Sequence, residues 1–486
     1  MNGYPPPPPG YPPSGPPPPP QSTLGVAALT QVLVAAFLCV IPFVVGPKLK
    51  EELGWVIVTV GSLALCGTVC AIVGLATRRR EPMPVRTGFL TAALIVGILE
   101  LLAGPIWSIG ACSATGRKAS CPHVYAHDGR SYRLDADPLS GALFAGGESD
   151  DLDRLEHLAP TAGEYRLRVV NELEEIDHID RVALLVADHP AGEEVLPTPA
   201  GDLVRVAGAA PPLDARDGRG RDVLAQVRRA DDDGFVSRAA DFAADGAAEP
   251  RERLTLRFAR PAGDGRVLLV LRTRSTAFAA DAFARYLAEM GPGTAWLMRW
   301  AQDASHYNYR DRLRDEVERL GLALKVAVKD GERWTPAATV RPIGPAVLRS
   351  IAVPLTLPPG DGAVEIRLDT APLFWELDEA RLGPAPSAPV QPLVLRPVAA
   401  HGGGRDLTRA LAEPDGDRVR LDRGQLVELR FAVPPPADTA RTVVLAMRGY
   451  YELELGPGVA FNPATMVRHR VGAISLPRYA LRLARR

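Results

Sequence analysis

Three long apolar segments near the N-terminus constrain this chain more strongly than any other feature of its sequence. They cover residues 24–46, 55–76 and 87–110, and the first two contain no charged side chain. Each exceeds the ~20 residues that a helix needs to cross the hydrocarbon core of a bilayer. A soluble helix of this length would show a polar face, and the first two segments show none. The pattern therefore predicts three transmembrane helices within residues 24–112.

The third segment carries one acidic residue, Glu100, near its middle. A carboxylate in the bilayer costs about 3 kcal/mol unless it is protonated or paired. A proton or ion path would need further acidic or basic partners, and the apolar segments supply none. We therefore interpret Glu100 as a protonated residue that forms a hydrogen bond between helices, with transport as the alternative.

The two loops between the segments differ in positive charge. Residues 77–86 contain four arginines, whereas residues 47–54 contain two lysines and two glutamates. Loops that are rich in Lys and Arg stay in the cytoplasm. We therefore expect a multi-pass protein of the inner (plasma) membrane, with its N-terminus in the cytoplasm and its C-terminal domains outside. Membrane lipid is then an expected partner.

The N-terminal tail, residues 1–23, contains twelve prolines and no charged side chain. Proline fixes φ and lacks the backbone N–H, so neither helix nor sheet is expected there. We expect a disordered, extended tail. The alternative is a proline-rich ligand for an aromatic groove on another protein.

Cys112 ends a stretch that is arranged like an export signal, with arginines, an apolar centre and then small residues. The sequence "SIGAC" at 108–112 is similar to a bacterial lipoprotein cleavage site, whose cysteine becomes lipidated. However, the stretch is internal and its apolar centre contains Glu100. We therefore expect an uncleaved anchor, with lipidation of Cys112 as the alternative.

The long C-terminal part changes to short runs of strand-forming residues separated by turns. "YRLRVV" at 165–170 alternates apolar and basic residues, which predicts a half-buried strand. Similar runs recur between turns such as "PAGDG" and "PPGDG", a pattern typical of antiparallel β-sandwich-like domains. Residues 230–250 are polar and irregular and are interpreted as a solvated loop. We divide the β-domains into residues 121–250, 251–385 and 386–486.

Residues 279–320 interrupt this pattern with helical spacing and predict a short helical insertion in the second β-domain. Its aromatic residues include Trp296 and Trp300, which are interpreted as core residues, with a ligand groove as the alternative. The expected fold is therefore mixed, membrane α plus mainly β. Three N-terminal transmembrane helices are followed by antiparallel β-sandwich-like domains with this helical insertion.

Cys121, His123 and His127 form a group of candidate metal ligands in "SCPHVYAHDGRSYRLD". A structural zinc site needs four ligands, usually in two pairs, and no second pair follows nearby. Asp128-Gly129 between alternating runs instead predicts a tight β-hairpin. Apart from these histidines, no neighbour in the sequence would activate Cys121 as a nucleophile. We therefore predict a hairpin, no metal site and no cofactor.

Two stretches, "CPHVYAHDGRSYRLD" and "NELEEIDHIDRVALLVADHP", resemble a bacterial family of uncharacterised membrane-anchored or lipoprotein-like exported proteins. The resemblance covers most of residues 121–455, and it implies a β-rich exported domain and no known activity. His123 and His127 stand where the family has apolar or aromatic residues, so the resemblance implies no metal site. The residues that carry it are Cys121, Pro122, Tyr125, Asp128, Gly129, Tyr132, Asn171, Glu172, Ile179, Asp180, Asp188, His189 and Pro190.

The sequence also limits the classes of function. The net charge of -1 gives no sign of a nucleic-acid partner. The motifs of serine hydrolases, zinc proteases, P-loop enzymes and dinucleotide-binding enzymes are absent from it. We therefore expect a membrane-anchored extracytoplasmic β-rich module rather than an enzyme. Its role would be binding or cell-envelope scaffolding, with an envelope protein or a glycan as ligand.

The alternative is an exported hydrolase whose site is assembled from distant carboxylates or histidines. The candidate residues are Asp135, Asp137, Glu376 and Asp378. Two carboxylates that face each other in a deep pocket would favour the hydrolase, whereas a shallow, aromatic-lined surface would favour the binding module.

Overall fold

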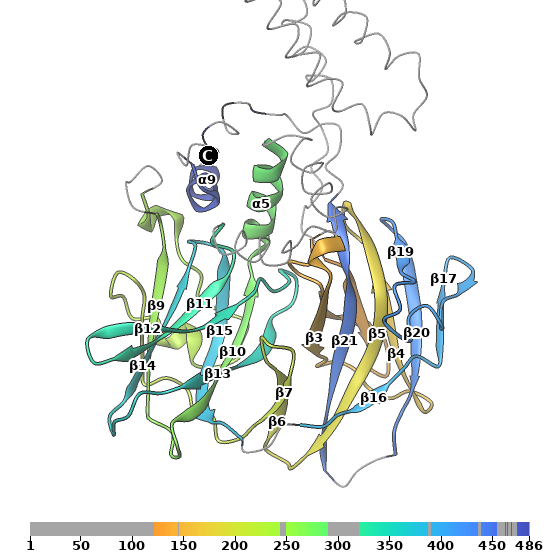
Figure 1. The fold of residues 1–486 in the computed structure, drawn as a ribbon, viewed down its shortest axis with the longest axis horizontal. Coiled ribbons are helices and arrows are strands. Elements are labelled where there is room, and N and C mark those ends of the chain that lie inside the picture. The colour runs from red at the N-terminus through yellow and green to blue at the C-terminus, as the bar shows by residue number, and fades with distance from the viewer. Residues whose placement is uncertain are drawn as a thin grey trace, which may run out of the picture. The chain divides into compact units, whose positions relative to one another are not determined.

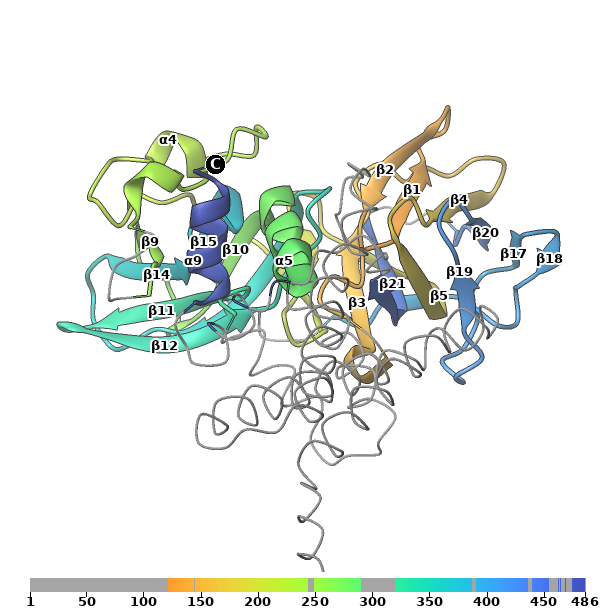
Figure 2. The same ribbon diagram turned by 90° about the horizontal axis from the view of Figure 1, so that it is seen from above.

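The structure, a computed structural model, describes residues 121–485 with gaps at 144, 244–248, 290–319, 387–389 and 436–438 and over most of 454–473. The chain separates into two compact units, Met1–Cys112 and Ser113–Arg486. All described residues belong to the second unit, which Figures 1 and 2 show from two directions.

The predicted membrane helices are corrected by the structure. Among the described residues, no helix is long and apolar enough to cross a membrane. The longest of them, α5, spans Ala277–Glu289 and has 13 residues, against the ~20 that a bilayer requires. The predicted fold class and the predicted multi-pass location in the inner membrane are therefore corrected for the described residues, which contain no such helix. The three apolar segments, Glu100, Cys112 and the proline-rich tail lie outside the described residues.

The β part of the prediction is confirmed, because the described residues form mainly antiparallel β-sheets (Figure 1). The strands of the first sandwich are β1 (His123–His127), β2 (Tyr132–Ala136), β3 (Ser149–Arg154), β4 (Glu164–Val170), β5 (Glu175–His189), β16 (Leu393–Leu395), β17 (Ala399–Gly402), β18 (Arg405–Asp406), β19 (Val419–Leu421), β20 (Leu426–Ala432) and β21 (Ala440–Leu453). One sheet has the order β18-β17-β20-β4-β1-β2 and the other β16-β5-β21-β3, with β19 beside β5. Their facing sides share a core that includes Val124, Leu184 and Leu429.

The second sandwich lies between the two halves of the first in the sequence. Its strands are β8 (Asp214–Arg216), β9 (Glu252–Phe258), β10 (Arg266–Ser275), β11 (Leu324–Asp330), β12 (Arg333–Val340), β13 (Arg349–Thr356), β14 (Val364–Thr370) and β15 (Trp375–Pro384). The sheet β13-β10-β15 packs on the sheet β12-β11-β14-β9-β8 around a core that includes Leu256 and Leu269.

Short helices accompany the second sandwich. Helix α5 and the C-terminal helix α9 (Leu476–Leu483) lie side by side and contribute Tyr286 and Leu476 to its core (Figures 1 and 2). Helix α4 (Leu224–Val227) and a 3₁₀ turn, η4 (Ala239–Asp241), follow β8, whereas the 3₁₀ turn η3 (Ala145–Gly147) precedes β3. Helix α5 is the described part of the predicted helical insertion, and Trp296 and Trp300 lie outside the described residues.

A hairpin of β6 (Glu194–Pro197) and β7 (Leu203–Val206) lies between the sandwiches (Figure 1). Successive strand residues point to opposite faces. Leu196 therefore packs with Leu268 of β10, while Val195 packs with Val444 of β21. The hairpin buries apolar side chains against both sandwiches at once.

Pairing between distant segments builds the first sandwich. Strand β4 pairs with β20, so that Leu167 lies opposite Leu429, and β5 pairs with β21 over its whole length. Strands of the expected segments 121–250 and 386–486 thus share both sheets of this sandwich. The expectations that depend on neighbouring residues are confirmed. Strands β1 and β2 form the predicted hairpin, and β4 has the predicted alternating burial.

Candidate functional site

Two of the four candidate carboxylates, Asp135 and Glu376, form hydrogen bonds or ion pairs with neighbouring described residues. Asp135 is buried and accepts hydrogen bonds from the backbone N–H groups of Glu156 and His157, at 3.0 and 2.9 Å. Burial raises its pKa. Glu376 of β15 pairs with Arg274 of β10 at 2.8 Å. Both carboxylates therefore belong to the framework of the sheets and loops.

Asp137 belongs to a buried cluster around Arg349 of β13. The Arg349 guanidinium contacts the carboxylates of Asp137, Asp151 and Asp153, at 3.6, 3.1 and 2.8 Å. The side chains of Arg349 and Asp153 are only 4% and 3% exposed. Burial raises the pKa of Asp137 and Asp153, although the guanidinium acts in the opposite direction. Because Arg349 lies in the second sandwich and the aspartates lie on or beside β2 and β3, this cluster joins the two sandwiches.

The candidate metal ligands also have other partners. Cys121 is buried, and burial raises the pKa of its thiol. His123 contacts Glu172 at 2.7 Å, and His127 contacts Thr161 at 3.1 Å. Among the described residues, no three His, Cys, Asp or Glu side chains are grouped so that they could hold a metal ion.

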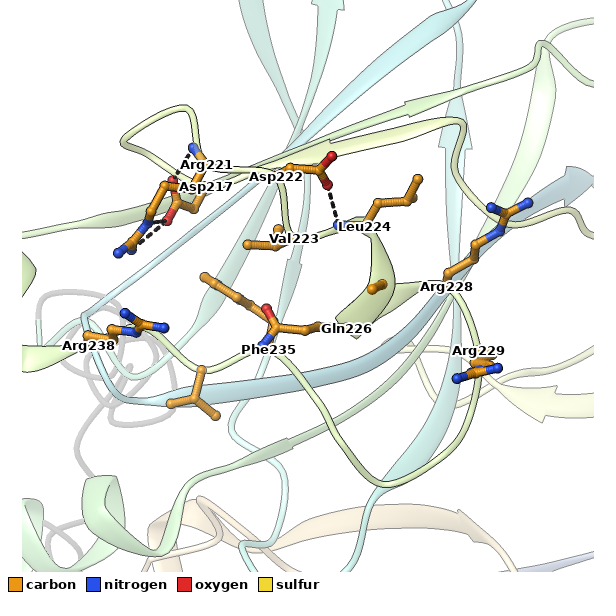
Figure 3. Close-up of a pocket in the computed structure, with 12 residues that line it drawn as sticks. Asp217, Arg221, Asp222, Val223, Leu224, Gln226, Arg228, Arg229, Phe235 and Arg238 are labelled. Atoms are coloured by element: carbon orange, nitrogen blue, oxygen red, sulfur yellow. Dashed lines mark hydrogen bonds and ion pairs between the residues drawn. The ribbon is translucent and has the colours of Figure 1, made fainter.

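A pocket of about 960 Å³ lies in the second sandwich beside α4 (Figure 3). Its walls come from the segment 217–229, which contains α4, and from the segment 235–238. Four arginines and two aspartates line it, together with an apolar set that includes Val223, Leu224 and Phe235. The structure thus combines guanidinium groups and an aromatic floor in one concave site.

Two of the four arginines already hold carboxylates. Arg221 contacts Asp217 at 2.6 Å and also contacts Asp241. Arg229 contacts Asp231 at 2.7 Å. Although burial opposes the ionisation of Asp217, its hydrogen bonds with Arg221 lower its pKa, so this carboxylate is charged at neutral pH.

The other two arginines, Arg228 and Arg238, have no ion pair and no side-chain hydrogen bond with any described residue. Both are exposed. The second aspartate of the pocket, Asp222, accepts a hydrogen bond at 2.9 Å from the N–H of Leu224, the first residue of α4. The pocket therefore presents two uncommitted guanidinium groups, whereas Asp217 is paired with Arg221 and Asp222 accepts a single backbone hydrogen bond.

The apolar floor is fixed by backbone contacts with β15. Phe235 and Leu377 exchange two backbone N–H···O hydrogen bonds, at 2.8 and 3.0 Å. A Cβ at Gly234 would lie 2.9 Å from Cγ of Glu376 and 3.0 Å from the Leu377 carbonyl oxygen. Only glycine permits this close approach. The Phe235 ring, whose residue is 7% exposed, is thereby held against the sandwich.

Asp378, the fourth sequence candidate, positions the same wall. It is fully buried and contacts Arg272, and it accepts a hydrogen bond from the Asp231 N–H at 3.4 Å. Arg272 in turn contacts Asp232 at 2.6 Å. Asp378 therefore holds the segment that connects Arg229 to Phe235, and it does not itself line the pocket.

Asp378→Asn is expected to lower the free energy of unfolding by about 2 kcal/mol, because a buried hydrogen bond to the charged Arg272 loses one ionic partner. Urea unfolding measures this loss. Asp264→Asn is the control, since Asp264 forms an exposed pair with Arg266 and its loss should have little effect. Equal stability of both variants would contradict the positioning role of Asp378.

Sequence reasoning missed this pocket because it interpreted residues 230–250 as a solvated loop. A signal was present, since Arg228 and Arg229 precede the acidic run 231–233 and Arg238 follows it. The sequence does not show which arginine an aspartate neutralises. That assignment depends on contacts with β10 and β15.

We compared the chain with protein-family models, with curated proteins and with solved structures, and none of them matched.

Proposed function

We propose that this chain is a binding protein whose ligand is anionic and occupies the pocket beside α4. The observation that carries the proposal is the pair of uncommitted guanidinium groups of Arg228 and Arg238 around an apolar floor. Guanidinium groups recognise carboxylates and phosphates through charge-assisted hydrogen bonds. Small-molecule pockets typically combine an apolar lining with a few polar groups that orient the ligand.

Binding accounts for this pocket better than hydrolysis does. A hydrolase needs a carboxylate or another group that can accept or donate a proton. Here Asp217 is tied to Arg221, and Asp222 is engaged at the start of α4. The pocket offers cationic recognition without a poised acid–base pair.

Arg228→Gln/Arg238→Gln is expected to weaken anion binding by at least about tenfold, because both charged contacts are removed. The full chain is heated with and without inorganic phosphate or hexanoate at low ionic strength, where exposed charges are least screened. A ligand that binds the folded state raises Tm. The unsubstituted chain should show this rise, and the double variant should not.

The matched control is Arg333→Gln/Arg405→Gln, which removes two exposed arginines of β12 and β18 and gives the same net charge. It should respond to anions like the unsubstituted chain. Equal losses of anion binding in both double variants would show that binding depends only on the net charge of the chain. That result would contradict the proposal.

A further inference from the structure

The charged groups of the pocket are divided between its two ends. Figure 3 shows Arg221 and Arg238 at one end and Arg228 and Arg229 at the other, with Phe235 between them. Each end has one arginine that already holds a carboxylate, Arg221 or Arg229. Each end also has one that is uncommitted among the described residues, Arg238 or Arg228.

The middle of the pocket is mainly apolar. Val223 and Phe235 are buried there, and Leu224 and Val236 are half-buried. The exposed polar residues Asp222 and Gln226 also lie there, and one Asp222 oxygen accepts a hydrogen bond from the Leu224 N–H. An extended ligand would therefore meet a cation, then mainly apolar side chains with Asp222 and Gln226 among them, and then a second cation.

We infer, building on the proposed function, that the ligand is an elongated small molecule with an anionic group at each end of an apolar middle. A ligand with one anionic group would compensate only one of the two arginines. A ligand with two such groups would compensate both, and the second contact would form within a complex that the first has already made. The volume of about 960 Å³ is sufficient for a ligand of this kind.

The test uses a series of unbranched α,ω-dicarboxylates, from succinate to sebacate, with the monomethyl ester of each acid as its partner. The ester has nearly the same length and apolar middle but only one charge. Calorimetric titration of the full chain measures the affinity of each compound. We expect an optimum length at which the dicarboxylate binds at least about tenfold more tightly than its monoester.

Single substitutions show whether both ends take part. Arg228→Gln and Arg238→Gln should each reduce the affinity for the best dicarboxylate to that for its monoester. Circular dichroism should show both variants folded, because each substituted side chain is exposed and forms no ion pair or side-chain hydrogen bond with a described residue.

Two failures are distinguishable. If each dicarboxylate binds no better than its monoester, and Arg228→Gln/Arg238→Gln weakens both, the ligand has one anionic group. The two-ended inference then fails while the proposed function stands. If none of the dicarboxylates, their monoesters, phosphate or hexanoate binds the unsubstituted chain, the inference and the proposed function both fail.

Discussion

Arg349→Met is expected to lower the free energy of unfolding by about 4 kcal/mol at neutral pH, because it leaves buried carboxylates without their cation. Arg349 is the shared partner of Asp137, Asp151 and Asp153, and it joins the two sandwiches. Methionine is flexible and occupies much of the same volume, so the loss of stability reflects the missing charge more than a cavity. Urea unfolding of the full chain measures it.

The effect of Arg349→Met should grow with pH. Burial raises the pKa of Asp137 and Asp153 above their usual range, and removal of the guanidinium would raise both further. A carboxyl whose pKa is raised by folding loses its stabilising contribution as the pH rises through that pKa. The destabilisation should therefore be smaller at about pH 5 than at about pH 8.

Two controls identify the cause. Arg266→Met removes a cation from an exposed pair with Asp264 and should change stability little. Adding Asp153→Asn to Arg349→Met removes one uncompensated carboxylate and should recover part of the loss. A stability of Arg349→Met equal to that of the unsubstituted chain at both pH values would contradict this account of the cluster.

A second large effect is expected at Glu175 and Asp177, which lie on one face of β5. They are 1% and 0% exposed, and the described residues place no cation against either carboxylate. Glu175 accepts a hydrogen bond from the Cys121 N–H at 2.7 Å, while the hydrogen-bond partner of Asp177 is the neighbouring Glu175 carboxyl. Burial raises the pKa of Asp177 to about 7, and burial with the neighbouring Asp177 raises the pKa of Glu175 well above its usual range. At least one of the two carboxyls therefore carries a proton in the folded state at neutral pH.

The direction of the pH dependence follows from these raised pKa values. Below about pH 4 Asp177 is protonated in both states, and between about pH 4 and about pH 7 the folded state holds more protons than the unfolded state. The contribution of Asp177 to stability is thus complete at the acidic end and lost as the pH rises through about 7. A shift of this size corresponds to about 4 kcal/mol. Ionisation of Glu175 extends the loss to higher pH.

Asp177→Asn is expected to remove most of this loss, because the amide cannot ionise. Relative to the unsubstituted chain, the variant should gain stability steadily from about pH 4 to about pH 7. Chemical unfolding at several pH values measures the difference between the two chains, so carboxylates that titrate in both cancel. Asp188→Asn is the control, because Asp188 is exposed and its pKa is lowered by hydrogen bonds with Arg441. A difference between Asp177→Asn and the unsubstituted chain that does not change with pH would contradict the buried acid pair.

Local signals predicted the parts of the fold that depend on neighbours in the sequence. Asp128-Gly129 predicted the hairpin of β1 and β2. In the loop between these strands, the backbone N–H groups of Arg130 and Ser131 both donate to the Asp128 side chain at 2.8 Å. The alternation at 165–170 predicted β4. The pairing of β4 with β20 could not be predicted in this way. It joins residues such as Arg168 and Glu428, which are 260 positions apart.

The same distinction separates the site from its sequence candidates. Asp137 and Asp378 attracted attention as carboxylates, yet long-range contacts with Arg349 and Arg272 make them structural. Arg228 and Arg238 differ from the other arginines of the pocket in having no carboxylate partner among the described residues. Sequence patterns report charge and periodicity, whereas compensation of a charge is a property of the folded chain.

Calorimetric titration of three forms of the full chain with the dicarboxylate of optimum length tests whether the pocket beside α4 holds the ligand. The forms are the unsubstituted chain, Arg228→Gln/Arg238→Gln and the charge-matched Arg333→Gln/Arg405→Gln. We expect equal affinity in the first and the third, and a loss of at least about tenfold in the second. Undiminished binding to Arg228→Gln/Arg238→Gln would contradict the claim that this pocket holds the ligand.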